Sequence, residues 1–344
     1  MKVIIDAFGG DNAPEEIIKG CADAVLEYGV EAALCGDEQR IREAAAKMNI
    51  GLDKIKIIPA DGVISMEDDP NLIVKEKKGC SMAEGMRRLA DGEYDAFVTA
   101  GSTGAAVMGS TFIVKRIKGV RRAALAPIMP SAKNGIMVID IGANAECRPE
   151  MLVQFGLMAS IYMEYAESVD SPKVGLLNIG VEETKGTPLQ LEAYRMLQRA
   201  PLNFIGNIEA REVPSGSCDI IVTDGFSGNI VLKLTEGVAL YLFGMVKSAF
   251  KANAKTKLAA ALMMPQLKQL KKKMDYTEYG GAPLIGISKP VIKAHGSSDA
   301  NALKNAVRQA IRYSESGVIS KIEQIMPELN EKIKSEQALQ QDAQ

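Results

Sequence analysis

The stretch DGFSGNIVLKLTEG, residues 224–237, holds an amide, an ammonium and a carboxylate at helical spacing. Asn229, Lys233 and Glu236 lie four and three residues apart, so a helix that begins near Asn229 carries all three on one face. An amide can donate to an oxyanion, and an ammonium can bind phosphate. Asp224 stands at the start of the same stretch. We therefore predict that residues 224–236 take part in anion chemistry.

A glycine pair near the start of the chain is a second candidate. The segment DAFGGDNAP contains Asp6, Gly9, Gly10, Asp11 and Asn12 directly after an apolar run. Glycines let the backbone approach an anion closely and point its amides at it. A tight turn from a strand into a helix explains the same residues equally well. The segment lacks the GxGxxG pattern of a dinucleotide-binding loop.

The segment GSTG, residues 101–104, offers two hydroxyl groups. Ser102 and Thr103 precede Gly104 and a helix of small residues. Free amides at a helix start, together with hydroxyls, suit phosphate. The segment is not a nucleotide-binding P-loop, because no GK[ST] follows it. Simple capping of the helix by serine or threonine is the alternative.

Four further polar residues stand in later loops. Asn144 follows a buried run beside Asp140, Lys185 lies in GVEETKG, Glu209 ends GNIE, and His295 lies in KAHGSS. A lysine in a loop at the end of a strand can offer a cation to phosphate. Each residue also has a structural reading: a hydrogen-bonded asparagine turn, a solvated lysine paired with glutamates, or a structural histidine.

The elements that must position these residues follow one repeated pattern. A short run rich in Val and Ile ends in a loop of Gly, Asn, Asp, Ser or Thr, and a segment with helical spacing usually follows. This alternation indicates an α/β fold with parallel strands buried on both faces. Right-handed crossovers place such loops at the carboxyl ends of the strands, where ligands bind. We therefore expect the loops to share one cleft.

Composition excludes several classes of protein. The 344 residues carry 41 basic and 43 acidic side chains, so no polyanion such as nucleic acid is an expected partner. Five scattered cysteines without a CxxC pair argue against disulfides and structural zinc. We find no run of 18 uncharged apolar residues and predict no membrane-spanning helix. With one histidine and no tryptophan, titratable chemistry must rest mostly on Asp, Glu and Lys.

The segment KTKLAAALMMPQLKQLKKKM, residues 255–274, departs from the strand and helix pattern. It contains six lysines and no acidic residue. We expect two short amphipathic helices separated by a turn at Pro265. An apolar tip bordered by lysines suits an anionic bilayer, whereas core packing or a dimer contact is the alternative. The residues expected to face the membrane are Leu258, Leu262, Met263, Met264 and Leu267.

These motifs together resemble the PlsX family of bacterial phosphate acyltransferases. The resemblance rests on DAFGGDNAP, GSTGA, LLNIGVEETKG, FIGNIEARE, DGFSGNIVLK, YGGAPLIGI and KAHGSS, and runs from residue 2 to residue 325 or so. Two positions depart from the family's usual pattern, with Phe8 in place of Met and Glu146 in place of Asp. The resemblance implies that Lys185, Asn229 and His295 act at the active site.

The resemblance also implies an activity and an architecture. The family transfers a fatty acyl group from acyl carrier protein to inorganic phosphate, giving acyl phosphate for phospholipid synthesis. A glycerol-3-phosphate acyltransferase follows in the sequence of reactions. The expected fold is a three-layer α/β/α sandwich with a mostly parallel sheet, similar to isocitrate and isopropylmalate dehydrogenases. Residues 1–330 would form one domain with a helical excursion at about 240–275, and residues 331–344 a tail.

Further expectations from the family concern assembly and location. They are a homodimer, no metal, no nucleotide cofactor, and a cytoplasmic protein peripherally associated with the anionic membrane. Two other classes of function stay open. One is a phosphate acetyltransferase or a dehydrogenase of the same architecture. The other is a membrane-surface scaffold that keeps the fold without the chemistry.

Overall fold

A computed structural model describes residues 1–133, 135–274 and 280–341. The strands are β1 (Lys2–Asp6), β2 (Glu31–Gly36), β3 (Ile55–Pro59), β4 (Ala96–Thr99), β5 (Ala124–Leu125), β6 (Ile128–Pro130), β7 (Gly135–Ile139), β8 (Lys173–Asn178), β9 (Asn203–Glu209), β10 (Ile220–Val222), β11 (Ala282–Ile285) and β12 (Val291–Lys293). The helices are α1 (Glu15–Tyr28), α2 (Glu38–Lys47), η1 (Pro70–Val74), α3 (Ser81–Ala90), α4 (Thr103–Gly109), η2 (Ser110–Lys115), α5 (Pro149–Tyr165), α6 (Pro188–Arg199), η3 (Ala210–Ser215), α7 (Gly225–Lys251), α8 (Ala254–Met274), α9 (Ala300–Glu315) and α10 (Val318–Gln341).

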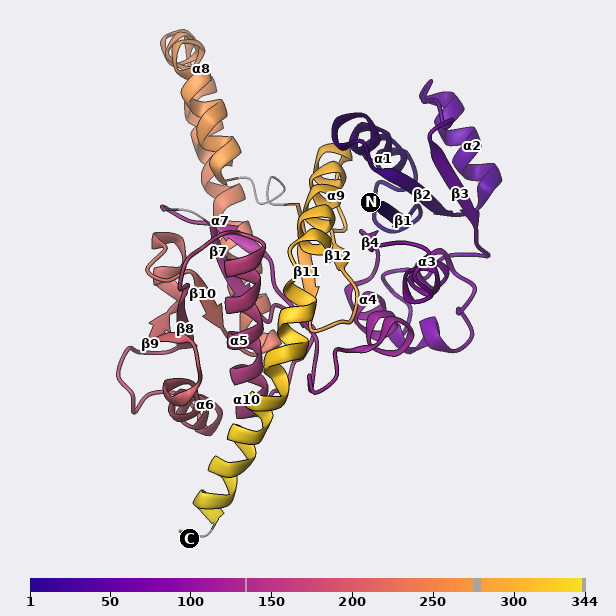
Figure 1. Ribbon diagram of the computed structural model, residues 1–344. Helices are drawn as coiled ribbons and strands as arrows, with labels where there is room; N and C mark the ends of the chain where they lie inside the picture. Colours follow the sequence, from indigo (N-terminus) through magenta and orange to yellow (C-terminus); the bar gives the residue numbers. More distant parts are fainter. Residues whose placement is uncertain (134, 275–279, 342–344) are drawn as a thin grey trace.

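The described strands form two sheets with helices on their faces (Figure 1). The first has seven strands in the order β3-β2-β1-β4-β12-β11-β5, and the second has five in the order β6-β7-β10-β8-β9. Most neighbouring strands are parallel; β11 is antiparallel to β12 and β5, and β6 to β7. This mixed α/β arrangement is consistent with a three-layer α/β/α fold.

The sequence pattern predicted one mostly parallel sheet, whereas the chain builds two. β5 pairs with β11 in the first sheet, and β6 pairs with β7 in the second. Only Ala126 and Pro127 separate β5 from β6, and a proline has no N–H with which to continue a ladder. Apolar periodicity identifies a strand but not the sheet it joins. The crossover at residues 126–127 therefore became visible only in the folded chain.

Burial on both faces explains why the first sheet reads as continuous apolar runs. On β1, Val3 and Ile5 pack into the cluster that contains α1 and α9, while Ile4 packs into the cluster that contains α3. All three side chains are fully buried. Helices on each face of a parallel sheet require this pattern. The sheet thereby holds its strand ends, and the loops that follow them, in fixed positions.

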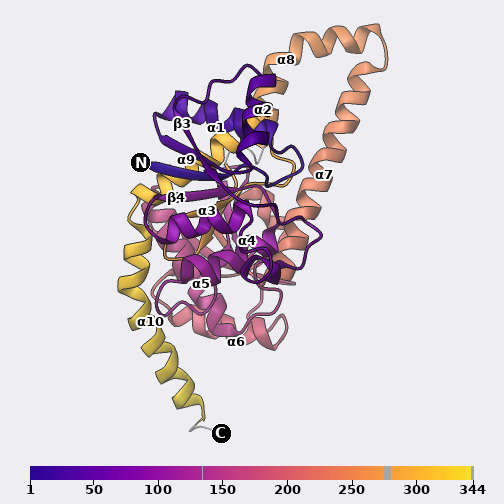
Figure 2. The ribbon, with the colours of Figure 1, turned by 90° about the vertical axis from the view of Figure 1, so that its right-hand side faces the viewer.

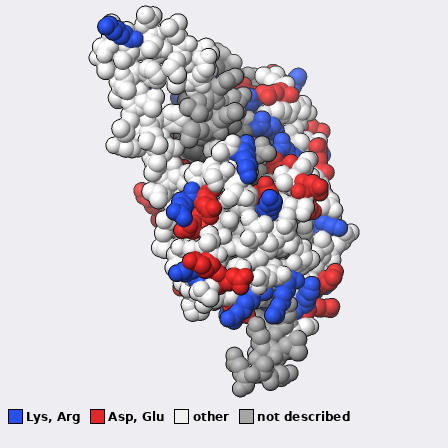
Figure 3. Space-filling view, turned by 90° about the vertical axis from the view of Figure 1, so that its left-hand side faces the viewer, with Lys and Arg blue, Asp and Glu red and all other residues white. Residues whose placement is uncertain are grey.

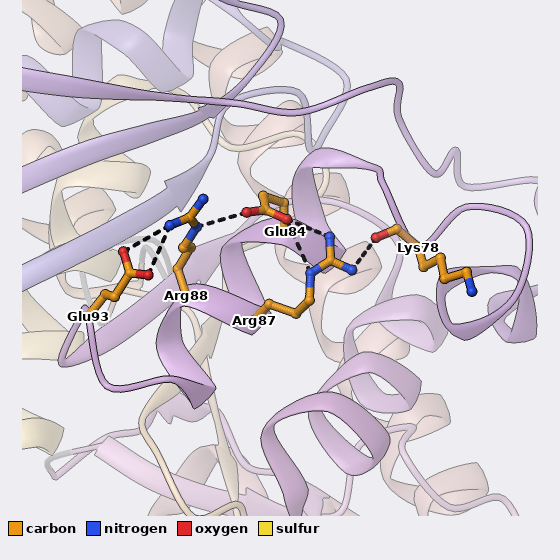
Figure 4. Close-up of polar contacts among 5 residues, drawn as sticks. All are labelled: Lys78, Glu84, Arg87, Arg88 and Glu93. Carbon is orange, nitrogen blue, oxygen red and sulfur yellow. Dashed lines mark hydrogen bonds and ion pairs between the residues drawn. The ribbon is translucent and has the colours of Figure 1, made fainter.

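Helix α3 is held by a chain of ion pairs (Figure 4). The Glu84 carboxylate accepts from the Arg87 and Arg88 guanidinium groups. Arg88 also pairs with Glu93, and Arg87 donates to the Lys78 carbonyl oxygen. The pairs are partly exposed and each contributes only about 0–1 kcal/mol. Their consequence is geometric, because they fix the helix whose first residue contacts the interior of the site described below.

Helices α7 and α8 form a hairpin that projects from the body (Figures 1 and 2). The predicted break at Pro265 is wrong, since α8 continues through it. On the face shown in Figure 3, most described atoms of the hairpin belong to uncharged residues, with positive charge near its tip. Its exposed large apolar residues include Leu240, Tyr241, Leu242, Met245, Val246, Leu258, Leu262, Met263 and Met264. The described part of this hairpin thus presents apolar side chains to solvent.

Length and composition single out α7 among the described helices as able to cross a membrane. The prediction of no membrane-spanning helix rested on the absence of an uncharged run of 18 residues, whereas α7 meets a criterion that allows two charged residues, with a mean hydropathy of 1.4. At the other end of the chain, the tail expected from residue 331 continues α10 as helix to Gln341. Ile333 is buried there, so the first part of that segment packs on the body.

Candidate active site

A cavity of about 320 Å³ lies between the two sheets, at the carboxyl ends of parallel strands. Residues that follow β4, β7 and β12 line it, together with α7 and the β5–β6 crossover. The predicted shared cleft is confirmed for these loops. Ligands bind at such strand ends in open α/β sheets, and a largely apolar cavity with a few polar groups is the usual form of a small-molecule site.

Helix α7 supplies one polar side of the cavity. The Asp224 carboxylate caps the helix, and Asn229, Lys233 and Glu236 all line the cavity. The predicted common face of these three residues is therefore confirmed. Asn229 is half-buried and Lys233 is exposed. An amide, an ammonium and a carboxylate are thus available within the same space.

Much of the remaining lining is apolar. Four of the apolar lining residues come from the β5–β6 segment. The apolar lining residues include Met66, Leu125, Pro127, Ile128, Met129, Ile141 and Leu232. All but Met66, Pro127 and Leu232 are buried. A hydrocarbon group fits this wall better than a sugar or a nucleotide does, because it leaves no polar group unpaired.

Lys293 brings a buried cation to the cavity. It ends β12, where it pairs with Thr99 of β4, and it is 7% exposed. Its ammonium donates to the carbonyl oxygens of Ala100, at 3.3 Å, and Ala294. Burial lowers the pKa of Lys293 to about 8, against the opposing effect of Asp6 and Asp11. Lys293 is therefore charged at neutral pH but close to titration.

Asp6 lies beneath the cavity as a buried acidic group. Its carboxylate accepts from Ser81 Oγ at 2.6 Å, from Thr99 Oγ1 at 2.8 Å and from the Phe8 N–H at 3.3 Å. Burial raises the pKa of Asp6, and these hydrogen bonds oppose the rise. The predicted substrate-binding residue thus contacts protein groups, and it supplies negative charge near Lys293.

The glycine pair allows close approach of two loops. A Cβ atom on Gly9 would lie 2.6 Å from Asp6 Oδ2 and equally close to the Gly101 nitrogen, which no side chain tolerates. Gly10 has a φ of 102°, which disfavours other residues. Close packing against the loops after β4 and β12, together with the positive φ of Gly10, therefore accounts for both glycines.

The two polar residues after the glycines hold the loop that carries the histidine. The Asp11 N–H donates to the Gly296 carbonyl oxygen at 2.8 Å. Asn12 Nδ2 donates to the carbonyl oxygens of Ser297 and Ser298 at 3.1 and 3.3 Å. In this arrangement Asp11 and Asn12 position residues 295–298.

His295 lies at the rim of the cavity with a defined hydrogen-bonding pattern. Its Nδ1 accepts the Ser297 backbone N–H at 3.2 Å and lies 2.8 Å from Ser297 Oγ. A neutral ring with Nδ1 as acceptor carries its proton on Nε2. Desolvation lowers the pKa of His295, helped by Lys293 and Lys233 and opposed mainly by Glu236. At pH 7 the ring is thus a neutral N–H donor.

We expect this state of His295 to be measurable directly. The sequence contains one histidine, so its ring signals need no assignment. Long-range ¹H–¹⁵N spectra over a pH titration should give a midpoint below the ordinary value of about 6.5 and an Nε2–H tautomer above it. A midpoint above that value, or an Nδ1–H tautomer, contradicts the assignment.

The other predicted residues near the cavity have mixed surroundings. Thr103 lines the cavity, whereas Ser102 caps α4 by accepting the Ala105 N–H. Gly104 packs against Pro70, where a Cβ would lie 2.5 Å from the proline ring. These contacts leave Thr103 as the hydroxyl of the GSTG segment that faces the cavity.

Asn144 belongs to a network around buried Asp140. Asn144 Nδ2 donates to Asp140 Oδ2 at 2.9 Å and to the Ala123 carbonyl oxygen at 2.8 Å. Asp140 also accepts the Leu125 N–H at 3.0 Å. The network ties the loop after β7 to β5, and Asn144 is not among the described cavity-lining residues. The structural alternative weighed for this residue matches these contacts.

Lys185 and Glu209 follow strands farther along the second sheet. β8 and β9 lie beyond β10, and neither residue is among the described cavity-lining residues of this chain. Lys185 is exposed, and its carbonyl oxygen accepts from Asn178 Nδ2 at 3.0 Å. Glu209 pairs with Arg211 at 2.6 Å. The order of the strands, which no local pattern encodes, separates these loops from the cavity.

Sequence reasoning missed Lys293 and the apolar wall. Lys293 is the last residue of the run PVIK and stands two residues before His295. A lysine at the end of a buried strand was the available signal. The apolar wall comes from the segment around Pro127, whose role depends on the crossover between sheets. Lys293 therefore joins Asn229, Lys233, His295 and Thr103 as polar groups of the site.

The sequence is similar to those of known proteins over most of its length. A family model described as "Fatty acid synthesis protein" matches residues 1–321. A protein of Alkaliphilus oremlandii named phosphate acyltransferase is 46% identical over 322 residues, covering 94% of this chain and 96% of that protein. A phosphate acyltransferase of Clostridioides difficile is 43% identical over 336 residues, covering 97% of this chain and 99% of that protein.

Solved structures extend the comparison to the fold alone. A phosphotransacetylase from Streptococcus pyogenes superposes with a TM-score of 0.61 at 17% identity, over 91% of this chain and 94% of the other. A 4-hydroxythreonine-4-phosphate dehydrogenase from Klebsiella pneumoniae gives 0.55 at 12%, over 92% and 99%. The fold is thus shared with transferases and dehydrogenases alike. The sequence matches decide the family: this chain belongs to the PlsX family of phosphate acyltransferases.

Proposed function

We propose that this acyltransferase moves a fatty acyl group from the thioester of an acyl carrier protein to inorganic phosphate, releasing acyl phosphate. One observation carries the proposal. A single cavity combines an ammonium, an amide and an imidazole with a largely apolar wall. The polar groups suit phosphate and a thioester carbonyl, and the wall suits a hydrocarbon chain. The wall also favours a fatty substrate over acetyl groups.

The reaction needs little help from a base. An oxygen of hydrogen phosphate attacks the thioester carbonyl carbon, a C–O bond forms, and negative charge develops on the carbonyl oxygen. The C–S bond then breaks, and the proton of hydrogen phosphate ends on the sulfur, so atoms and charge balance. A thiolate is a modest base, since a free thiol has a pKa of about 8.5. Positioning and oxyanion stabilisation therefore dominate.

The cavity residues divide between these two tasks. Asn229 Nδ2 donates to the developing oxyanion, and His295 Nε2–H is a second neutral donor. Lys233 and Thr103 line the same cavity, and their ammonium and hydroxyl groups favour binding of the phosphate. The role that the family resemblance predicts for Lys185 is a separate proposal, because Lys185 lies outside the described lining of this cavity. Comparing the turnover of Lys185→Ala with that of the wild type tests it.

Mass spectrometry tests the reaction as a whole. The protein is mixed with palmitoyl carrier protein, with and without inorganic phosphate. We expect the carrier to lose the palmitoyl mass, and palmitoyl phosphate to appear, only when phosphate is present. Turnover of acetyl-coenzyme A but not of palmitoyl carrier protein would favour the phosphate acetyltransferase alternative. Turnover of neither acetyl-coenzyme A nor palmitoyl carrier protein would favour the scaffold alternative.

Met129 offers a test of where the acyl chain lies. It is buried on β6 and lines the apolar wall. Met129→Phe should leave less space for a long acyl chain along the wall. The value of kcat/KM for the palmitoyl carrier should therefore fall at least about tenfold relative to that for the octanoyl carrier. Steady-state rates with octanoyl, dodecanoyl and palmitoyl carriers provide the measurement.

Met137 provides a matched control for that change. It is fully buried on β7, directly beside β6, and is not among the described lining residues. Met137→Phe should cost about 1–3 kcal/mol of stability through overpacking without altering the ratio of rates between chain lengths. An equal shift of that ratio in both variants would place the chain elsewhere.

We also propose peripheral contact with the anionic cytoplasmic face of the membrane through α8. Leu258 and Leu262 are 65% and 74% exposed, and Met263, Met264 and Leu267 extend the apolar surface. In flotation with vesicles that contain phosphatidylglycerol, Leu258→Glu with Leu262→Glu should abolish binding, because two charges oppose insertion. Leu26→Glu on α1 is the control, since Leu26 is 77% exposed but distant in the fold. Unchanged flotation of the double variant excludes this surface.

We also propose a homodimer, on the basis of exposed apolar residues outside α8. Ile179 and Val181, after β8, are 81% and 57% exposed, and Phe226 and Ile230 on α7 are exposed as well. Large apolar side chains that are exposed in a single chain are candidates for an interface. Light scattering after size exclusion should give twice the chain mass, and Ile179→Glu should lower the measured mass.

Release of acyl phosphate at the membrane would place the product near a glycerol-3-phosphate acyltransferase. Co-sedimentation of the two enzymes on vesicles tests that partner.

A further inference from the structure

We propose that the ammonium of Lys293 is the cation that binds inorganic phosphate in the cavity. The identity of the anion rests on the proposed function, whereas the assignment of the residue rests on the geometry of the site. The sequence motifs favoured Lys185 for this task, and the structure offers a different lysine.

The first argument is the hydrogen bonding of the ammonium group. A lysine has three N–H donors and no acceptor. Within the described residues, two carbonyl oxygens, those of Ala100 and Ala294, accept from Lys293. One donor is left for a ligand, and Lys293 lines the cavity in which that ligand would lie. A desolvated donor without an acceptor is costly, so an anion that supplies one is favoured.

The second argument is charge. Among the described residues, no carboxylate lies within ion-pair distance of Lys293. Asp6 is the main opposing charge, but its two oxygens already accept from Ser81 and Thr99. The positive charge is therefore attracted by Asp6 without being covered by it. The ammonium therefore keeps an N–H and a positive charge that an anion in the cavity can contact.

The third argument is space. Gly281 and Gly296 line the cavity together with Lys293, and neither places a side chain there. Gly281 has a φ of 103°, and a Cβ on it would lie 2.9 Å from the Lys293 carbonyl oxygen. Thr103, on the neighbouring loop after β4, adds a hydroxyl to the same cavity. A tetrahedral anion thus finds a cation, a hydroxyl and open backbone together.

The competing lysines are less suited to the task. Lys233 lines the cavity but is exposed, so water screens its charge, whereas Lys293 acts in a medium of lower dielectric constant.

The titratable groups around Lys293 are Asp6 on β1, Asp11 after β1, His295 after β12, and Lys233 and Glu236 on α7. Burial, the main influence, brings the pKa of Lys293 down to about 8. Its charge is present below that pH and is lost above it.

Calorimetric titration with inorganic phosphate, without any acyl carrier, tests the assignment. Lys293→Met should weaken phosphate binding about 10²-fold, and in turnover it should raise the KM for phosphate by a similar factor with the KM for palmitoyl carrier little changed. Lys289→Met is the matched control. Lys289 lies four residues earlier, outside the described lining, and its loss should leave phosphate binding unchanged. Unchanged affinity in folded Lys293→Met overturns the proposal.

A pH series of the wild type and Lys293→Arg covers the case in which Lys293→Met fails to fold. Wild-type affinity should fall above pH 8 or so, although phosphate itself becomes more negative over that range. The arginine variant should bind more weakly but keep its affinity there, because its guanidinium stays charged. Wild-type affinity that does not fall between neutral pH and pH 9.5 also overturns the proposal.

The two proposals fail in different ways. Lys293-dependent phosphate binding without transfer from palmitoyl carrier protein supports the Lys293 site and rejects the proposed function. Transfer from palmitoyl carrier protein with a phosphate KM that is unchanged by Lys293→Met supports the function and rejects the Lys293 site.

Discussion

Replacement of Asn229 by alanine is expected to lower kcat about 10²–10³-fold, the usual effect of losing one oxyanion donor. Asn229 is half-buried on α7 and lines the cavity, where an amide N–H costs no reorganisation when charge develops on the carbonyl oxygen. The KM for both substrates should change little, because the donor acts mainly on the transition state. Steady-state kinetics with palmitoyl carrier protein and phosphate provides the measurement.

Three variants show whether the donor itself is responsible. Asn229→Asp keeps the shape but removes the N–H, so it should be as slow as the alanine variant. Thr235→Ala lies on the same helix, where the Thr235 hydroxyl donates to the Val231 carbonyl oxygen at 2.7 Å, and it should retain full activity. His295→Ala should lose less activity than Asn229→Ala. A larger loss at His295 than at Asn229 reverses the assignment of roles.

Replacement of Asp6 by alanine is expected to have the largest effect on stability, about 3–5 kcal/mol less free energy of unfolding. Asp6 is 2% exposed and accepts from the hydroxyls of Ser81 and Thr99. Its removal leaves these donors unsatisfied and leaves Lys293 without its main opposing charge. Urea denaturation followed by circular dichroism measures the difference.

Two further substitutions separate the charge from the hydrogen bonds. Asp6→Asn offers one acceptor oxygen where two hydroxyls donate to different oxygens, so its loss should be smaller but still substantial. Asp95→Ala, at an exposed position directly before β4, removes an acceptor for the Lys2 N–H and should cost no more than about 1 kcal/mol. Similar losses for Asp6→Ala and Asp95→Ala would show that the buried network contributes little.

The predicted cleft illustrates how far a local pattern reaches. Most apolar runs followed by a polar-glycine loop folded as strands with their loops at the carboxyl end, because burial on both faces requires continuous apolar residues. The run NFIG is an exception, since β9 continues to Glu209. The common face of Asn229, Lys233 and Glu236 follows from helical periodicity alone. Such features depend on neighbours in sequence, and they were predictable for that reason.

The loops that stay outside the cavity show the limit of that reasoning. Lys185 and Asn229 both follow buried strands, and nothing local distinguishes them. Strand order places β10, which leads into α7, next to β7 and the crossover, and β8 one position farther away. Which strand ends meet is set by pairing between residues far apart in the chain.

The glycine pair near the amino terminus makes the same point at atomic scale. Its sequence suits an anion-binding loop and a tight turn equally, and the structure shows Gly9 against Asp6 and Gly101. Residues close together in the chain were enough to predict most strands and helices, the polar loops and the family. The division into two sheets, the apolar wall at Pro127 and the burial of Lys293 became visible only in the folded chain. Local periodicity encodes which face of an element is buried, whereas the partner that buries it is chosen by packing over the whole chain.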